Sequence, residues 1–123
     1  GAWVRQCGRS LPLAQRLNNP KALLLDVLSE TFRRKSARCG VAFNPGFAGA
    51  YDMVRGREFA DAMQGFLDGL PDGGLVMCHP GFVDEVLVSL DNVTHQRERE
   101  FAFLNGDDFP RLLAANNVTL NRT

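Results

Sequence analysis

The amino-acid sequence predicts an α/β fold with a mostly parallel sheet and flanking helices. One observation is the alternation of strand-like and helix-like segments along the chain, which is typical of parallel sheets with right-handed crossovers. A second is the apolar run Leu-Val-Met-Cys at 75–78, which lies between turn residues at 71–74 and 80–81. A short apolar run bounded in this way indicates a parallel strand buried on both faces.

The chain length of 123 residues predicts a single domain, 1–123, with a modest core. The 14 basic and 14 acidic side chains cancel, so there is no charge footprint of a nucleic-acid partner. No apolar run is long enough to span a membrane. The three cysteines, Cys7, Cys39 and Cys78, form no CxxC pair. They favour reduced thiols in the cytoplasm, with a zinc site made from them as the alternative.

The first third of the chain predicts a strand at 2–7, a loop at 8–19 and a long helix. Asn19 is the expected N-cap of this helix, Pro20 its first residue and Gly40 its left-handed cap. Apolar side chains recur at helical spacing and give the helix one apolar face: Leu23, Leu24, Val27, Leu28 and Phe32. The basic residues Arg33, Arg34, Lys35 and Arg38 suit a solvated helix end; a phosphate site is the alternative.

The middle of the chain predicts a strand at 41–43, a glycine-rich loop at 44–51 and a helix at 57–68. The loop lacks the GxxxxGK[ST] order of a phosphate-binding loop, so we interpret it as lining a substrate site. The helix carries its apolar side chains on an inner face: Phe59, Met63, Phe66 and Leu67. Gly69 ends it, and the buried strand at 75–78 follows.

The last third of the chain predicts helices and one final strand. Residues 82–90 form either a short helix or a loose wrap. Thr94 caps a helix that runs to Leu104, with Phe101 and Leu104 facing inward. A second short helix runs from 109 or 110 to 115, with Asp107 or Asp108 as its N-cap, and 118–120 is the last strand.

His79 stands at the carboxyl end of the predicted buried strand. Pro80 disfavours a helical conformation at His79, and Gly81 permits a sharp exit. Open sheets and β/α barrels place their ligand sites at this end of their strands. The alternative is a structural histidine whose ring bonds a loop backbone.

Several stretches resemble the YdjC-like carbohydrate deacetylase family. The stretch at 77–84, Met-Cys-His-Pro-Gly-Phe-Val-Asp, is similar to a signature near the end of the family's domain. The run Arg-Glu-Arg-Glu at 97–100 followed by Phe103-Leu104, and the closing 112–120, are similar to it as well. The stretches at 47–52 and 70–75 resemble the subgroup associated with hopanoid biosynthesis.

The resemblance implies half of a β/α-barrel-like fold, of the glycoside hydrolase and deacetylase type. It also implies a divalent metal, Mg or Zn, held in the intact protein by an early aspartate and two histidines. This sequence has neither an early Asp-Asp pair nor a His-x-His. We therefore expect the chain to be the carboxyl-terminal part of the domain, with no metal bound in the fragment and no activity of its own.

The implied reaction is hydrolysis of an N-acetyl group on a small carbohydrate. His79 matches the family's His-Pro-Gly histidine and is the expected catalytic acid. Arg5, Pro80 and Gly81 are the expected substrate-binding residues.

We expect Arg97 and Glu100, three apart on one helix face, to pair or to brace the His79 loop as structural support. His95 is expected to be exposed.

Truncation would leave open sheet edges and an uncovered apolar face. We therefore expect the fragment to be a homo-oligomer, with Trp3 or the strand at 118–120 near the contact. The competing hypothesis is a non-catalytic α/β interaction module, because a fold does not by itself establish a function.

Overall fold

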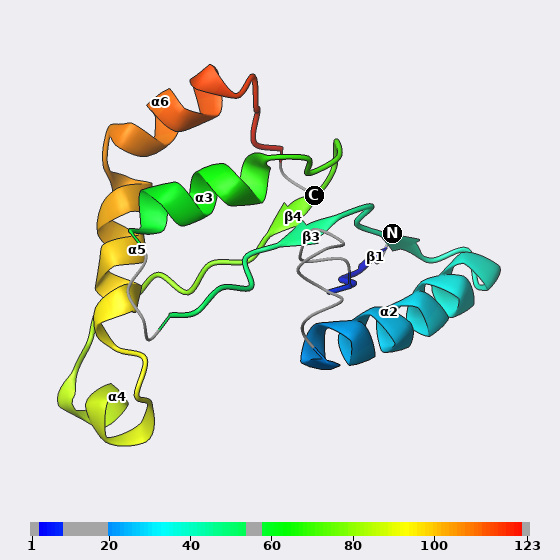
Figure 1. The fold of residues 1–123 in the computed structure, drawn as a ribbon, viewed down its shortest axis with the longest axis horizontal. Helices are drawn as coiled ribbons and strands as arrows, with labels where there is room; N and C mark the ends of the chain where they lie inside the picture. The colour runs from blue at the N-terminus through cyan, green and yellow to red at the C-terminus, as the bar shows by residue number, and fades with distance from the viewer. Residues whose placement is uncertain (1–2, 9–19, 54–57, 122–123) are drawn as a thin grey trace. The chain divides into compact units, whose positions relative to one another are not determined.

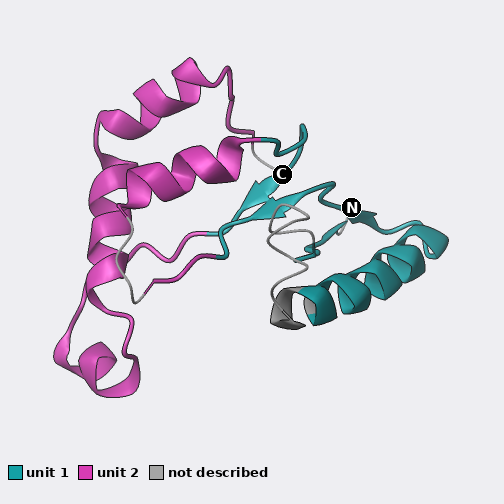
Figure 2. Ribbon diagram, viewed as in Figure 1, with its two compact units in different colours: residues 1–50, 69–77 teal, residues 51–68, 78–123 magenta. Residues whose placement is uncertain are grey.

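The computed structural model describes residues 3–8, 20–53 and 58–121 (Figure 1). It divides into two compact units (Figure 2). The first unit comprises residues 1–50 and 69–77, and the second comprises residues 51–68 and 78–123.

The first unit contains two pairs of parallel strands and one long helix. β1 (Trp3–Val4) pairs with β2 (Ala42–Phe43), and β3 (Phe47–Ala48) pairs with β4 (Leu75–Val76). The crossover from β1 to β2 contains α2 (Pro20–Arg38). The predicted α/β class with parallel strands is therefore confirmed. Within the described residues the strands form two separate pairs and close no barrel.

The bounds of α2 follow from residues at its two ends. Pro20 is its first residue, where a missing N–H costs nothing. Gly40 adopts φ 66°, and the N–H of Val41 returns to the carbonyl of Ser36 at 3.0 Å, which closes the last turn. The predicted N-cap Asn19 and most of the predicted loop at 8–19 lie outside the described residues.

The side of α2 that packs against the rest of the first unit is polar. Ser36 is buried, and the Ser29 hydroxyl accepts from the Gly8 N–H and donates to Gln6 Oε1, at 3.0 and 2.9 Å. The guanidinium of Arg33 lies over the ring of Phe43, 5.6 Å from its centroid. The predicted apolar face of the helix is instead exposed. On the polar side, Ser29 gives a hydrogen-bond partner to the buried Gln6, which follows β1.

β3 corrects the prediction of a glycine-rich loop at 44–51, because two of these residues form a strand. Phe47 and Ala48 are buried, and the Ala48 carbonyl accepts from the Met77 N–H at 2.9 Å. The strand ends at Gly49, which has φ 112°; a Cβ there would lie 2.2 Å from the Met77 carbonyl oxygen. A two-residue strand among Pro and Gly residues carries no alternating pattern, so its sequence predicts a loop.

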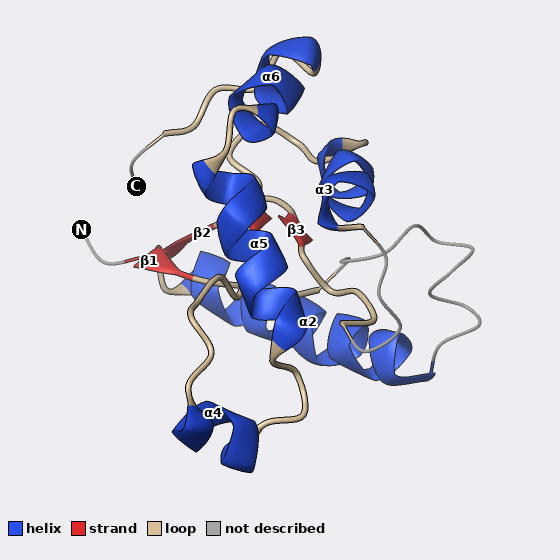
Figure 3. Cartoon of the chain, turned by 90° about the vertical axis from the view of Figure 1, so that its left-hand side faces the viewer, coloured by secondary structure: helices blue, strands red, loops and turns tan. Residues whose placement is uncertain are grey.

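The second unit is helical. It consists of α3 (Phe59–Leu67), α4 (Glu85–Leu90), α5 (His95–Asn105) and α6 (Asp108–Ala115). α5 contacts both α3 and α6 (Figure 3). Phe59, Ala62 and Met63 of α3 are buried, and the ring of Phe103 lies 5.5 Å from that of Phe59 and 5.8 Å from that of Phe109. The predicted inner face of α3 is thus confirmed at Phe59 and Met63.

The ambiguous segment at 82–90 contains α4, a single short helix. Asp84 is its N-cap, and its carboxylate accepts from the Leu87 N–H at 2.7 Å. This is the usual way in which an aspartate satisfies a helix start. None of the residues of α4 is buried.

The predicted last strand at 118–120 is wrong. Asn117 adopts φ 53°, and the N–H of Val118 donates to the Leu113 carbonyl at 2.9 Å. This bond closes α6 in the manner of a left-handed cap, so the Val118 N–H cannot serve a strand ladder. Residues 118–121 have no regular secondary structure, and Leu120 is exposed. Among the described helices, none is long and apolar enough to cross a membrane.

Candidate functional site

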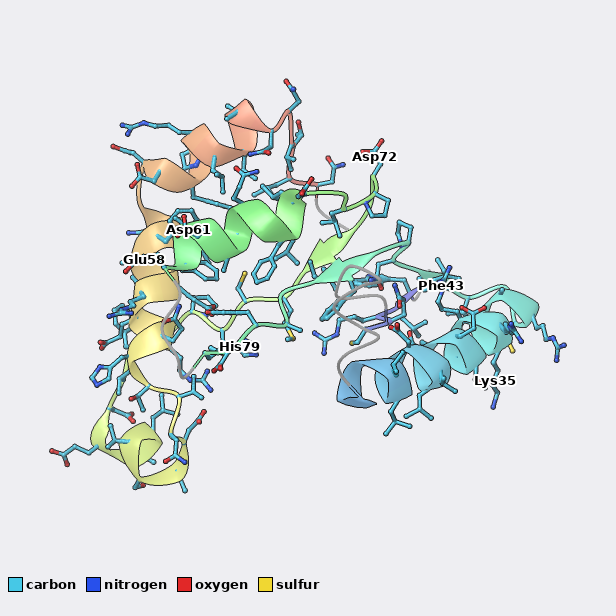
Figure 4. All side chains as sticks on the ribbon, in the orientation of Figure 1. Lys35, Phe43, Glu58, Asp61, Asp72 and His79 are labelled. Atoms are coloured by element: carbon cyan, nitrogen blue, oxygen red, sulfur yellow. The ribbon has the colours of Figure 1, made fainter. Side chains whose placement is uncertain are left out.

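The segment that carries His79 is attached to α5 at two points. The backbone N–H of His79 donates to Oε2 of Glu100. The N–H of Gly81 donates to the backbone carbonyl of Arg97 at 3.2 Å. His79 is labelled in Figure 4. These two bonds fix the path of residues 79–81 along the helix.

Glu100 is the centre of this site. Glu100 is 0% exposed, and both of its carboxylate oxygens accept a hydrogen bond. Oε1 accepts from the Tyr51 hydroxyl and Oε2 from the His79 N–H. A buried carboxylate is tolerated only when donors replace its lost hydration. Tyr51 and His79 supply these donors from two segments that lie far apart in sequence.

Tyr51 presents its hydroxyl from an aromatic surrounding. Its ring lies 5.9 Å from that of Phe59 and 5.6 Å from that of Phe66. Burial raises the pKa of the Tyr51 hydroxyl well above its usual value; the hydrogen bond to Glu100 adds to this rise and the side chain of Gln96 opposes it. The phenol therefore keeps its proton and acts as a hydrogen-bond donor at neutral pH.

Cys78 lies directly before His79, but its thiol is held in the unreactive form. Burial, and then the charge of Glu100, raises the pKa of this thiol to about 11. Because the thiolate is the nucleophilic form, Cys78 is a poor nucleophile at neutral pH. It therefore fills space beside the site.

Arg97 contributes through its backbone and its side chain separately. Its guanidinium contacts Asp91, with Nη2 and Oδ2 2.6 Å apart, and its Nε–H donates to the Val93 carbonyl at 3.0 Å. The hydrogen bond from Arg97, followed by the one from the Val93 N–H, holds the pKa of the Asp91 carboxyl below its usual range. The side chain of Arg97 thus fixes the turn at 91–93, and its carbonyl holds Gly81.

The structure places the other sequence-predicted residues as follows. His79 is half-buried, and its Nδ1 is a buried atom with no hydrogen-bond partner in the described chain. Pro80 is exposed, and a Cβ at Gly81 would meet nothing within 4 Å. Arg5 is an exposed residue of the first unit, directly after β1. His95 is exposed, as expected.

Tyr51 and Gln96 are members of this site that the sequence reasoning did not single out. Tyr51 belongs to the stretch 47–52 that carried the resemblance, and it is the only tyrosine of the chain. Gln96, which is buried, lies one helical turn before Glu100. A four-residue spacing from Glu100 was therefore the available signal for Gln96.

A second buried polar cluster lies in the first unit and joins the ends of β1 and β2. The Gln6 N–H donates to Asn44 Oδ1 at 2.9 Å, and Asn44 Nδ2 donates to the carbonyls of Gln6 and Gly46 at 3.1 and 2.7 Å. Gln6 Nε2 donates to the Asn44 carbonyl at 3.2 Å. These reciprocal bonds satisfy both amides, so the pair has a structural role.

The metal centre that the resemblance implies cannot be built from the residues in view. No three His, Cys, Asp or Glu side chains lie together as a possible metal site within residues 3–8, 20–53 and 58–121.

Comparison with protein families finds that the family described as "YdjC-like protein" matches residues 1–115. No curated protein and no solved structure matches the chain.

Proposed function

This chain belongs to the family of YdjC-like proteins, and on that premise we propose that it forms part of a carbohydrate deacetylase. The reaction is hydrolysis of an N-acetyl group on a small carbohydrate. Water adds to the carbonyl carbon, the C–N bond breaks, and the products are acetate and the amine. We further propose that the chain supplies the carboxyl-terminal part of the enzyme and that its pathway is hopanoid biosynthesis.

His79 is the proposed general acid, which protonates the leaving amine nitrogen. The observation that carries this role is the anchoring of residues 79–81 to α5 through Glu100 and Arg97. An acid contributes most when its position is fixed before the reaction begins. The imidazole is also the side chain that exchanges protons most readily near neutral pH.

Other residues have supporting roles in this proposal. The open space beside Gly81 is proposed to admit a carbohydrate hydroxyl, with the exposed Pro80 next to it. Arg5, an exposed cation, would contact a substrate hydroxyl or carboxylate. Glu100 and Arg97 brace the His79 segment. The free thiols of Cys7, Cys39 and Cys78 support a reducing compartment, the cytoplasm.

A divalent metal, Mg or Zn, belongs to the proposed intact enzyme. When bound, such an ion polarises the amide carbonyl and lowers the pKa of water. The described residues of this chain offer no ligand set for it. In this proposal the metal is held by residues other than the described residues of this chain.

The test is the substitution His79→Ala in the full-length protein encoded by the natural reading frame. We expect kcat on N-acetyl amino sugars to fall by roughly a hundredfold or more, with unchanged metal content by elemental analysis. His95→Ala, which removes an exposed histidine, is the matched control and should leave kcat unchanged. A loss of metal in the His79 variant would make this residue a ligand and refute its role as the acid.

The non-catalytic interaction module remains the second candidate. The observation that favours it is the exposure of the apolar side chains on α2 and α4, because large exposed apolar faces are typical of binding surfaces. A folded full-length protein without turnover on any N-acetyl sugar in the presence of Mg or Zn would support the module against the enzyme.

A further inference from the structure

The exposed side of α2 is apolar in its first turns. Leu24, Val27 and Leu28 are 60, 65 and 58% exposed, and Leu23 and Phe32 lie at the edges of the same face. The opposite side of α2 packs against the rest of its own unit, through the buried Ser36 and through the Ser29 hydroxyl, which accepts from the Gly8 N–H. The exposed apolar face is therefore set by the orientation of the helix in this unit.

The same side of α2 becomes basic toward its carboxyl end. Arg34 lies seven residues after Val27, and Arg38 lies four residues after Arg34. Lys35 lies seven residues after Leu28. Residues at these spacings share one helix face. Lys35 and Arg38 are exposed, and the Arg34 side chain is 75% exposed while its Nε pairs with Glu30 at 3.2 Å. Figure 4 shows Lys35 on the side of α2 away from Phe43.

One continuous helix face thus carries leucine, valine and phenylalanine in its first part and cations in its last two turns. We propose that this face of α2 binds the surface of an anionic phospholipid bilayer. The apolar side chains enter the boundary between headgroups and acyl chains, and Arg34, Lys35 and Arg38 contact lipid phosphates. In-plane helices bind membranes by this combination of apolar burial and attraction to anionic lipid.

The charged residues near α2 and near α4 differ, and this difference decides which of these two exposed apolar segments we assign to lipid. Phe82, Val86, Val88 and Leu90, in and near α4, are also exposed. Their exposed charged neighbours are the carboxylates of Asp84 and Glu85, which an anionic surface repels. Asp91 is paired with Arg97. α2 alone of these two segments combines exposed apolar side chains with exposed cations. The α4 segment therefore provides an internal control.

The experiment measures partition of the full-length protein, encoded by the natural reading frame, onto vesicles by flotation. The vesicles are phosphatidylcholine with about one-third phosphatidylserine, compared with phosphatidylcholine alone. We expect binding to the anionic vesicles, weakened at least tenfold on neutral vesicles. The binding should also weaken in about 0.5 M salt, because salt screens the attraction of the cations.

Two sets of variants separate the contributions of charge and apolar surface. Arg34→Gln, Lys35→Gln and Arg38→Gln together should weaken binding about a hundredfold, at about fivefold for each cation. Leu24→Gln with Leu28→Gln should weaken it about tenfold or more. The matched controls are Arg99→Gln with Arg111→Gln, and Val86→Gln with Val88→Gln, which should leave binding unchanged. Far-UV circular dichroism confirms that each variant is folded.

Two outcomes would overturn the proposal. One is a folded chain that does not bind the anionic vesicles, or that binds neutral vesicles equally well. The other is sedimentation equilibrium showing a self-associated chain that dissociates on Leu24→Gln with Leu28→Gln while vesicle binding is absent. The latter result would assign the face of α2 to a second copy of the chain.

Discussion

The backbone N–H of His79 donates a hydrogen bond to Oε2 of Glu100, which lies 21 residues later in the chain. The other oxygen of the same carboxylate accepts from Tyr51, 49 residues earlier than Glu100. A single fully buried side chain therefore connects the loop after β3, the segment after β4 and α5. The proposed acid is held in place by a group that need not touch the substrate.

Removing this carboxylate should destabilise the protein. Glu100→Ala leaves the Tyr51 hydroxyl and the His79 N–H without their acceptor, at an expected cost of about 3 kcal/mol in the free energy of unfolding. Urea denaturation measures this cost. Glu98→Ala, at an exposed position of the same helix, is the control and should change stability by less than about 0.5 kcal/mol. Equal urea midpoints for the two variants would contradict the prediction.

Removing only the phenol oxygen tests the other half of this arrangement. Tyr51→Phe keeps the ring contacts with Phe59 and Phe66 but takes away one of the two donors to a buried carboxylate. We expect a loss of about 1–3 kcal/mol, again by urea denaturation. A variant as stable as the parent chain would show that Oε1 of Glu100 finds another donor.

The ionisation of Tyr51 can be followed directly, because the chain has one tyrosine. Since the pKa of this phenol is raised in the folded state, the unfolded chain loses the proton first as the pH rises. Stability should therefore fall from about pH 10 upward. Absorbance at about 295 nm should show no phenolate in the folded protein near pH 10, where an ordinary tyrosine is half ionised. A midpoint near pH 10 before unfolding would refute the prediction.

The cysteines should differ in reactivity. Cys39 is exposed, whereas the pKa of Cys78 is raised to about 11, so alkylation near pH 8 should modify Cys39 at least tenfold faster. Peptide mapping by mass spectrometry gives the two rates. In urea the rates should become similar. Fast modification of Cys78 in the folded protein would mean that its thiol is not buried beside Glu100.

Two glycines make a matched pair for testing the backbone. Gly49→Ala should cost about 2 kcal/mol or more, because φ is 112° and the new Cβ would meet the Met77 carbonyl oxygen. Gly65→Ala, inside α3 with open space around its Cβ position, should stabilise by about 0.5–1 kcal/mol. Thermal unfolding of both variants checks the opposite signs, and a Gly49→Ala variant at least as stable as the parent would contradict the structure at Gly49.

Local sequence signals identified the elements that have clear ends. Pro20 and Gly40 mark the limits of α2, and Thr94 marks the start of α5. β3 was not predicted from the sequence, because a strand of two residues shows no alternation of apolar and polar side chains. The strand at 118–120 was expected from β-favouring residues, but the Val118 N–H closes α6. Backbone capping there outweighs side-chain propensity.

The site was only partly predictable for a different reason. The motif His-Pro-Gly at 79–81 is a local feature, and the sequence shows it directly. The partnership of Glu100 with Tyr51 joins residues 49 positions apart, and no local pattern specifies such a pair. The exposure of the apolar face of α2 was equally hidden, because periodicity identifies a face without telling what covers it.

The amide pair Gln6 and Asn44 has a consequence for the alignment of β1 with β2. Each strand has only two residues, so the ladder alone discriminates poorly between neighbouring alignments. A shift by one residue turns side chains to the opposite face and would separate Gln6 from Asn44, breaking the bonds between them. Several buried polar groups would then lose partners together. The two side chains thus select the observed alignment of β1 with β2, because a misaligned pair would leave buried amides without hydrogen-bond partners.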